Sequence, residues 1–274
     1  MHKFTILTSL YNSEPFLKNY FETIFNQFIL PDEIILIDDT KNPHNLKEII
    51  EEQKIKYKFD NIVLLKNPNN LGPTLSLNKG LQNCSNNLVF RLDVDDLWLT
   101  NHTKQTLEYY EKDGSYLIYA NSLKKKNFLT NIKCDEYFIN ENHLIHSSWL
   151  INRNVLKNFN YRMKRPSVAL EDYYTILFYT WKNFKIFYSY NITTVYTENI
   201  FSHGRTYLKN NKYINIRKKI SILFLKKHLE NKNFLQIIYF ILFQYGLLKF
   251  IVFLLWILDY LRIRKFFYYI KKYL

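Results

Sequence analysis

Short apolar runs alternate along the chain with longer segments whose apolar positions recur every three or four residues. The runs are typical of strands buried on both faces, and the wider spacing is typical of amphipathic helices. Strands are predicted at residues 4–12, 32–39, 61–67, 88–96 and 115–120, and helices at residues 13–30, 43–57, 73–84 and 101–113. Because strand and helix alternate with short connections, we expect an α/β fold in which a mostly parallel, Rossmann-like mixed sheet is flanked by helices.

Residues 121–170 follow this alternation less clearly. The lysine-rich stretch 123–127 indicates a solvated loop. Residues 146–159 indicate a strand that leads into a helix. No internal repeat or long Gly/Ser linker interrupts the chain, so the alternating part is interpreted as one domain.

Three of the predicted strands end in polar side chains. The first ends in residues 8–12, the second in Asp38 and Asp39, and the fourth in residues 93–96, which include three aspartates. Ligands of parallel α/β sheets bind beyond the carboxyl ends of the strands. The shared placement of these polar residues therefore predicts a ligand site at that edge.

The acidic segment 93–96 is the most informative of the three. On a continuing strand, Asp93 and Asp95 would face the same side. Two carboxylates about 6 Å apart repel by about 2–3 kcal/mol at an effective dielectric constant near 20. Mg²⁺ or Mn²⁺, which binds one or two carboxylates together with water and phosphate oxygens, would offset that repulsion. Alternatively, one aspartate caps the following helix, although Thr100 and Asn101 are also placed to cap it.

Glycine is rare, with five in 274 residues, and two of them lie within nine residues of each other. Gly72, just before a predicted helix, indicates a positive φ or a close approach of the backbone to a ligand. Gly80, inside that helix, costs about 1 kcal/mol relative to alanine unless packing requires it. A tight turn and a helix crossing would explain the two glycines as well as a ligand site would.

Taken in order, these segments resemble the inverting family 2 glycosyltransferases of the GT-A fold, of the bacterial surface-glycan type. The matching segments are "ILTSLYN", "EIILIDDTKN", "NNLGPTLSLNKGLQNCSNNLVFRLDVDD", "ALEDYYTILF" and "YTENIFSHGRTY". The first lacks the family's usual proline. The third ends in a DXD motif, and the fourth resembles the family's Glu-Asp signature. The resemblance covers residues 4–207. It implies a nucleotide-sugar-binding and catalytic domain at 1–207. The region at 208–274 lies outside the resemblance, and its own sequence predicts a helical, basic, membrane-associating region.

The resemblance also implies roles for individual residues. Asp172 would be the catalytic base, with Glu171 beside it as support. Substrate-binding roles fall on Ser9 and Tyr11 at the nucleoside, Asp38 at the uracil ring, Asp93 at the ribose or the metal shell, and Arg205 at the diphosphate. Metal-binding roles fall on Asp95, Asp96 and His203, and the choice between the two aspartates stays open.

The implied reaction transfers a sugar from a nucleotide sugar, a UDP-sugar in our interpretation, to a hydroxyl of a glycan acceptor of the lipid-linked, lipopolysaccharide or capsule type. A positioned carboxylate removes the proton of the acceptor hydroxyl. Mn²⁺ or Mg²⁺ stabilises the charge on the leaving diphosphate. One displacement inverts the anomeric carbon. Without the family pattern, residues 171 and 172 would indicate only an acidic helix N-terminus, which the helix dipole favours.

The net charge of +14 is concentrated near the end of the chain. Residues 1–204 carry 23 Lys and Arg against 22 Asp and Glu, whereas residues 205–274 carry 15 Lys and Arg against only Glu230 and Asp259. A neutral body with a basic, apolar tail indicates attachment to an anionic surface. Cys84 and Cys134 form no disulfide framework, which favours a reducing compartment.

The tail contains one long apolar stretch, residues 234–258, whose single charge is Lys249. The stretch is long enough to span a bilayer, but basic residues flank it on both sides, and a span would place one cluster on the wrong side. Interfacial helices, or a shallow hairpin near Gly246, keep both clusters on one face. A helix pair packed on the catalytic body is the alternative. We expect peripheral or monotopic association with the cytoplasmic face of the inner membrane.

Two other functions are consistent with parts of the sequence. A nucleotidyltransferase would normally carry a Gly-rich loop with Arg or Lys after the first strand, and residues 8–16 contain none of these. A nucleic-acid-binding protein would use the basic tail for phosphates. That tail is apolar between its charges and the body is nearly neutral, so no nucleic-acid partner is expected.

Overall fold

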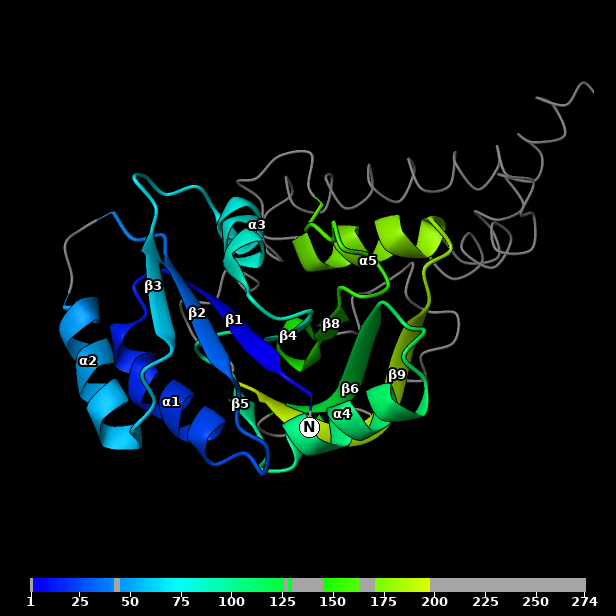
Figure 1. Cartoon of the computed structure of the whole chain (residues 1–274), viewed down its shortest axis with the longest axis horizontal. Helices are drawn as coiled ribbons and strands as arrows, with labels where there is room; N and C mark the ends of the chain where they lie inside the picture. Colours follow the sequence, from blue (N-terminus) through cyan, green and yellow to red (C-terminus); the bar gives the residue numbers. More distant parts are fainter. Residues whose placement is uncertain (1, 42–44, 126–127, 130–144, 163–170, 198–274) are drawn as a thin grey trace, which may run out of the picture. The chain divides into compact units, whose positions relative to one another are not determined.

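The computed structural model describes residues 2–41, 45–125, 128–129, 145–162 and 171–197 (Figure 1). Its strands are β1 (Phe4–Leu10), β2 (Glu33–Asp38), β3 (Ile62–Lys66), β4 (Leu88–Arg91), β5 (Leu97–Trp98), β6 (Ile118–Lys125), β7 (Phe128–Leu129), β8 (Leu150–Asn152) and β9 (Ile186–Tyr196). Its α-helices are α1 (Leu17–Phe25), α2 (Leu46–Tyr57), α3 (Pro73–Asn83), α4 (His102–Lys112) and α5 (Glu171–Trp181), and two 3₁₀ turns are η1 (Glu14–Phe16) and η3 (His146–Ser148).

Nine strands of the described chain form one mixed sheet in the order β3-β2-β1-β4-β8-β6-β9-β5, with β7 paired to β6. The first four strands are parallel, β8 is antiparallel to β4, and β6 and β9 are parallel to each other. The predicted α/β fold with a mostly parallel mixed sheet is confirmed. The predicted C-terminal helical region lies outside the described residues.

The register of the parallel strands brings their polar ends to one edge. Leu10 of β1 is paired with Asp38 of β2, and Leu7 of β1 is paired with Arg91 of β4. The polar residues that follow these strands therefore leave the sheet at its carboxyl edge, which is where ligands of such sheets bind.

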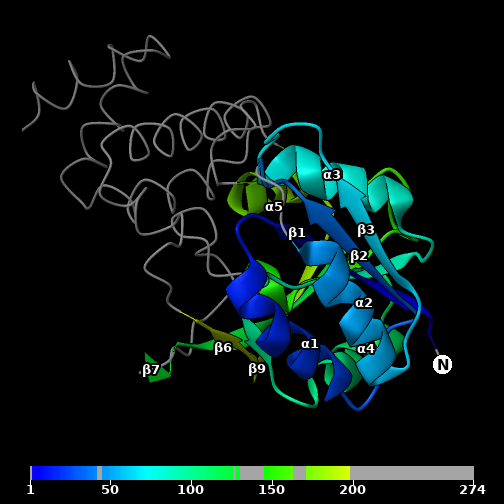
Figure 2. The same cartoon turned by 90° about the vertical axis from the view of Figure 1, so that its left-hand side faces the viewer.

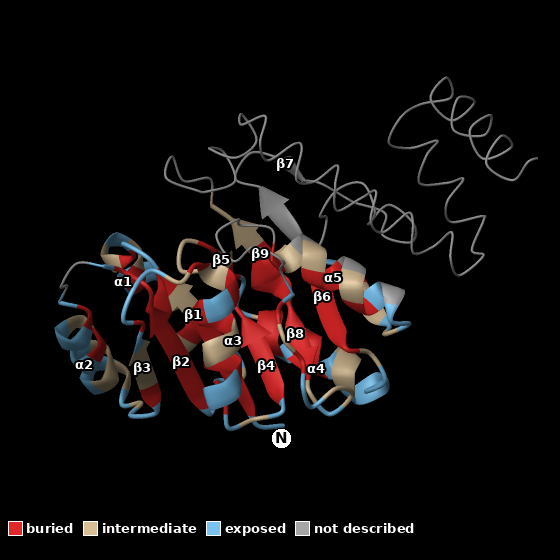
Figure 3. Cartoon of the chain, turned by 90° about the horizontal axis from the view of Figure 1, so that it is seen from above, coloured by how far each residue is buried: buried red, intermediate tan, exposed pale blue. Residues whose placement is uncertain are grey.

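Helices cover both faces of the sheet. Apolar residues of α1, α2 and α4 pack on one face, and apolar residues of α3 and α5 pack on the other (Figure 2). Side chains alternate along β1, so Phe4 and Ile6 belong to the first cluster while Leu7 belongs to the second. The central strands are buried as a result (Figure 3). This double burial explains why their sequences are uninterrupted apolar runs.

The fourth predicted strand is shorter than expected. It ends at Arg91, and residues 93–96 form a turn in which the N–H of Asp96 donates to the carbonyl of Asp93 (3.2 Å). The carbonyl of Leu92 accepts a hydrogen bond from Thr8 Oγ1 (2.7 Å), so a side-chain donor replaces the backbone donor that a continuing strand would provide. The prediction that Asp93 and Asp95 share one face of a strand was wrong.

Two predictions in residues 121–170 were also wrong. The expected loop at 123–127 is partly strand, since β6 continues to Lys125 and pairs with the distant strand β9. No helix follows β8 in the described residues up to 162; instead Asn152 Oδ1 accepts the N–H of Asn154 (3.1 Å) in a local turn. Such side-chain bonds to the backbone compete with helix formation.

Gly80 lies where α3 crosses the sheet closely. A Cβ at this position would lie 2.3 Å from Leu7 Cδ1 and 2.6 Å from Ile37 Cδ1. We expect Gly80→Ala to lower the free energy of unfolding by about 1–3 kcal/mol through overpacking, because the clash outweighs the helical preference of alanine. Urea denaturation measures this. Gly114→Ala is the control, since its Cβ would come no closer than 3.4 Å to Tyr110; equal losses in both variants would contradict the explanation.

Candidate active site

A buried arginine holds the first carboxylate of the acidic turn. Arg91, which is 1% exposed, donates to the carbonyl of Leu7 (3.3 Å), to the carbonyl of Leu92 and to Asp93 Oδ1. Partial burial by itself would raise the pKa of Asp93, but attraction by the Arg91 guanidinium outweighs it and holds that pKa below its usual value. Asp93 is therefore a fixed anion at the end of β4.

Asp96 connects three segments of the chain. It is buried, and its two oxygens accept hydrogen bonds from Ser147 Oγ (2.5 Å) and from the backbone N–H of Thr197 (3.0 Å). Burial, followed by the charges of Asp93 and Asp95, raises its pKa. Its carboxylate thus joins the turn after β4 to η3 and to the end of β9.

Asp95 differs from its two neighbours. It is half-buried, and no hydrogen bond from another residue of the described chain reaches its carboxylate. Burial and the charge of Asp93 raise the pKa of Asp95 to about 6. Of the three aspartates, it is the one whose oxygens remain available to a ligand.

The first turn of α5 belongs to the same electrostatic cluster. Glu171 is buried, and its pKa is raised to about 8 by burial and then by the charges of Asp172 and Asp93. Its Oε1 lies 4.0 Å from Nδ1 of His146. Burial lowers the pKa of His146 to about 3, so this contact joins neutral groups. The charge of Asp93 in the DXD segment thus acts on Glu171, although the two residues are far apart in sequence.

The raised pKa of Glu171 predicts a pH dependence of stability. A carboxyl whose pKa is higher in the folded state stabilises the fold fully below its unfolded pKa, about 4.5, and loses that contribution as the pH rises through about 8. The melting temperature of the wild type should therefore fall more steeply from pH 6 to pH 9 than that of Glu171→Gln. Asp95 and Asp96 titrate in both proteins, so the difference isolates Glu171. Parallel curves would contradict this.

The predicted nucleoside residues lie along the same carboxyl edge. Asp38, at the end of β2, is buried; its Oδ1 accepts the N–H of Thr40 (2.9 Å) and its Oδ2 lies 3.1 Å from Lys66 Nζ. Ser9 is half-buried, and Tyr11 is 48% exposed at the end of β1.

Asp39 anchors the loop that precedes α3. Its carboxylate accepts hydrogen bonds from Asn67 Nδ2 and from the backbone N–H groups of Leu71 and Gly72, each at 2.8 Å. Gly72 has a φ of 79°, so the predicted positive φ is confirmed. This role of Asp39 was not predicted from the sequence, in which only its place beside Asp38 pointed to this edge.

Sequence reasoning missed three contributors to the acidic cluster: Arg91, Ser147 and Thr197. Arg91 stands within an apolar run, where a buried cation is unexpected. The other two reach the aspartates only because β8 pairs with β4 and β9 pairs with β5. Of the predicted residues, His203 and Arg205 lie outside the described residues. His203 follows Thr197 by six positions, and the backbone of Thr197 is bonded to Asp96.

The acidic turn has the donor chemistry of a hard-cation site. No group of three or more His, Cys, Asp or Glu side chains suited to a metal occurs in the described part of the chain. Mg²⁺ and Mn²⁺ sites at phosphates, however, use one or two carboxylates, and water and phosphate oxygens complete the shell. Burial, followed by the crowding of like charges, raises the pKa values of Asp95 and Asp96, and a divalent cation would relieve that crowding. These residues therefore fit a cation shared with a diphosphate.

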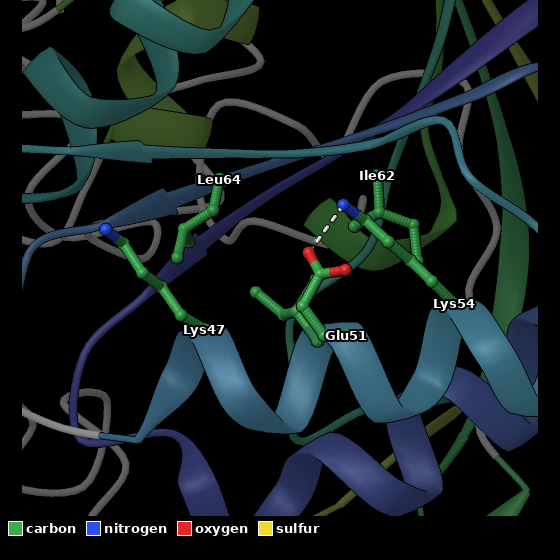
Figure 4. Close-up of a pocket in the computed structure, with 6 residues that line it drawn as sticks. Lys47, Glu51, Lys54, Ile62 and Leu64 are labelled. Atoms are coloured by element: carbon green, nitrogen blue, oxygen red, sulfur yellow. Dashed lines mark hydrogen bonds and ion pairs between the residues drawn. The ribbon is translucent and has the colours of Figure 1, made fainter.

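A separate cavity lies between α2 and β3 (Figure 4). Its charged pair, Lys54 and Glu51, forms an ion pair of 2.7 Å. The lining residues are Lys47, Ile50, Glu51, Lys54, Ile62 and Leu64. The cavity is at the edge strand of the sheet, three strands from β4, and it lacks paired carboxylates. We assign it no chemistry.

Residues 5–184 match the model of the family described as "Glycosyl transferase family 2". The chain is 30% identical over 128 residues, 46% of each chain, to UDP-Gal:alpha-D-GlcNAc-diphosphoundecaprenol beta-1,3-galactosyltransferase of Escherichia coli. It is 32% identical over 110 residues to amylovoran biosynthesis glycosyltransferase AmsE of Erwinia amylovora, covering 39% of this chain and 40% of that one. These matches span less than half the length of either relative.

Two solved structures share the fold. S. aureus TarS in complex with UDP-GlcNAc aligns with a TM-score of 0.60 at 16% identity, covering 87% of this chain and 79% of that one. The mannosyltransferase PcManGT from Pyrobaculum calidifontis, in complex with GDP-Man and Mn²⁺, aligns with a TM-score of 0.61 at 13% identity, covering 83% of this chain and 64% of that one. At these identities the likeness shows the fold alone.

Proposed function

The chain belongs to glycosyl transferase family 2 and is a glycosyltransferase, and we propose that it is a metal-dependent, inverting enzyme that uses a UDP-sugar. The proposal rests on one observation: η3 contacts both acidic segments, since His146 lies 4.0 Å from Glu171 at the start of α5 and Ser147 lies 2.5 Å from Asp96 in the turn after β4. The family match decides against the nucleotidyltransferase and the non-enzymatic alternative.

In this proposal Asp172 is the general base. It is half-buried at the start of α5, one residue after the buried Glu171. A carboxylate in this place would take the proton of the acceptor hydroxyl as that oxygen attacks the anomeric carbon. Burial, followed by the charge of Asp172, raises the pKa of Glu171, which is why the less buried Asp172 is proposed as the base. A single displacement gives inversion.

Asp95 is the metal ligand of the proposal. Both oxygens of Asp96 already accept hydrogen bonds within the protein, whereas Asp95 is not so engaged in the described chain. A bound Mn²⁺ or Mg²⁺ would stabilise the negative charge that develops on the leaving diphosphate. Asp93, fixed by Arg91, would accept a hydrogen bond from the ribose or from a water on the cation. His203 and Arg205 would approach the diphosphate from the segment after Thr197.

A uridine nucleotide is proposed for the base site. One oxygen of Asp38 would accept the N3–H of uracil, with Ser9 and Tyr11 beside the nucleoside. TarS has been crystallised with UDP and with UDP-GlcNAc, whereas the structure of PcManGT is a complex with GDP-Man and Mn²⁺. The acceptor is proposed to be a lipid-linked or polysaccharide glycan, because the E. coli relative is named for a diphosphoundecaprenol acceptor and AmsE for amylovoran biosynthesis.

Membrane association is proposed for the C-terminal region. We divide the chain into a catalytic domain, residues 1–207, and a basic, apolar region, residues 208–274, that binds the cytoplasmic face of the inner membrane. Within the described residues, no helix has the length and hydropathy needed to cross a bilayer. The apolar stretch 234–258 lies outside those residues, so the proposal rests on its sequence and on the net charge of the region.

A ligand screen by thermal shift tests the proposed donor. A ligand that binds only the folded state raises the melting temperature. The full chain should be stabilised by UDP and by at least one UDP-sugar in the presence of Mn²⁺, and much less when EDTA replaces the metal. GDP and CDP are the matched controls. A shift with GDP instead of UDP would overturn the uridine assignment, and equal shifts with and without metal would overturn metal dependence.

A further inference from the structure

We propose that Ser147 of η3 is a positioning residue that fixes the acidic turn for the cation and the diphosphate. The inference rests on the proposed function, and it deepens it by assigning a role to a residue outside the family-like motifs. Ser147 is fully buried, and its position in sequence, 51 residues from Asp96, hides the relationship.

The hydroxyl of Ser147 contacts two of the three aspartates of the turn. Its Oγ accepts the backbone N–H of Asp93 (2.9 Å) and lies 3.2 Å from Asp93 Oδ2 and 2.5 Å from Asp96 Oδ2. A serine hydroxyl has one proton to donate. The shorter distance assigns that proton to Asp96, so one side chain fixes the backbone at the start of the turn and the carboxylate at its end.

Ser147 is itself held rigidly. Its carbonyl accepts a hydrogen bond from Trp98 Nε1 (2.6 Å), and Trp98 is buried and stacked on His102 with ring centroids 4.4 Å apart. Trp98 belongs to β5, directly after the acidic turn. The turn is therefore bonded to η3 at both ends, and the hydroxyl reaches it in a fixed orientation.

Removing the hydroxyl should loosen the turn at two points. The N–H of Asp93 would lose its acceptor, and the buried carboxylate of Asp96 would lose a donor. Asp95 lies between them in sequence, so the direction of its carboxylate depends on both attachments. Outer-shell residues that orient metal ligands change metal affinity by about 10- to 100-fold when they are removed. We expect an effect of that size on binding of Mn²⁺ with UDP.

Ser148 provides a matched control on the same 3₁₀ turn. It is also fully buried, but its Oγ donates to the carbonyl of Ile145 (2.8 Å) and accepts the N–H of Asn121 at 3.4 Å, and within the described chain it makes no hydrogen bond to an aspartate. Ser147→Ala and Ser148→Ala both remove a buried hydroxyl from η3. A general loss of packing would affect both variants, whereas a positioning role would affect only the first.

The experiment titrates the full chain with Mn²⁺ in the presence of UDP and follows free Mn²⁺ by electron paramagnetic resonance. The dissociation constant should rise about 10- to 100-fold in Ser147→Ala and stay within about threefold of wild type in Ser148→Ala. Equal changes in the two variants, or none in Ser147→Ala, would overturn the inference. If Ser147→Ala does not fold, Ser147→Cys takes its place, since a thiol is a weaker donor of similar size. Its dissociation constant for Mn²⁺ should rise by a smaller factor, and a wild-type value in this variant would also overturn the inference. A wild type that neither binds Mn²⁺ with UDP nor turns over would instead count against the proposed function.

Discussion

Replacing Asp172 with asparagine should lower kcat by about 10²- to 10⁴-fold, the range that a general base contributes. Asparagine has nearly the same shape as aspartate but cannot take a proton from the acceptor hydroxyl. Binding of UDP with Mn²⁺, measured by thermal shift, should be unchanged, because the side chain acts on the acceptor. Turnover is measured as release of UDP from the donor identified in the ligand screen.

Glu108→Gln is the control for this substitution. Glu108 is an exposed carboxylate on α4, and its replacement removes the same charge from the protein surface. Its turnover should match that of the wild type. If Asp172→Asn keeps kcat within about threefold of wild type, the assignment of the base is wrong, and a carboxylate outside the described residues would have to be sought.

Replacing Asp95 with asparagine should reduce turnover by about 10²- to 10³-fold, comparable to the loss of one stabilising group at a developing charge. Here the binding of Mn²⁺ with UDP should be lost as well, since the side chain is the proposed ligand. The melting temperature of the unliganded protein should not fall. The carboxylate is destabilised by burial and by Asp93, as its pKa of about 6 indicates, so a neutral amide relieves that repulsion.

Comparison with Asp96→Asn tests whether Asp95 is the metal ligand and Asp96 the structural carboxylate. Asp96 is buried and bonded to Ser147 and Thr197, so its replacement should lower the melting temperature. In the opposite result, unliganded Asp95→Asn would be destabilised, and Asp96→Asn would be stable but unable to bind Mn²⁺. Asp96 would then be the metal ligand and Asp95 the structural carboxylate.

The parallel strands were the easiest part of the fold to predict. Residues 4–10 and 33–38 lie inside the sheet, where burial on both faces leaves an apolar run as the signal. The predicted strand at 88–96 was too long. The carbonyl of Leu92 accepts a hydrogen bond from the side chain of Thr8, which is distant in sequence, and nothing in the local sequence indicates this. Strand β9 and its pairing with β6 depend on contacts between distant segments, which periodicity does not report.

The site was predictable to the level of motifs and not to the level of contacts. The aspartates at 93–96 could be identified from their place at the end of a buried strand, whereas the pair at 171 and 172 could be identified only through the family resemblance. The sequence did not distinguish Asp95 from Asp96. That distinction depends on Ser147 and Thr197, which reach Asp96 only through the pairing of β4 with β8 and of β5 with β9.

The most direct test of the account is the position of Mn²⁺ in crystals of the full chain grown with UDP and MnCl₂, located by its anomalous scattering. We expect one strong peak beside the Asp95 carboxylate and the diphosphate, with the uracil at Asp38 and with Asp172 facing the same pocket. A peak coordinated away from residues 93–96, or a diphosphate bound with no metal beside Asp95, would contradict it.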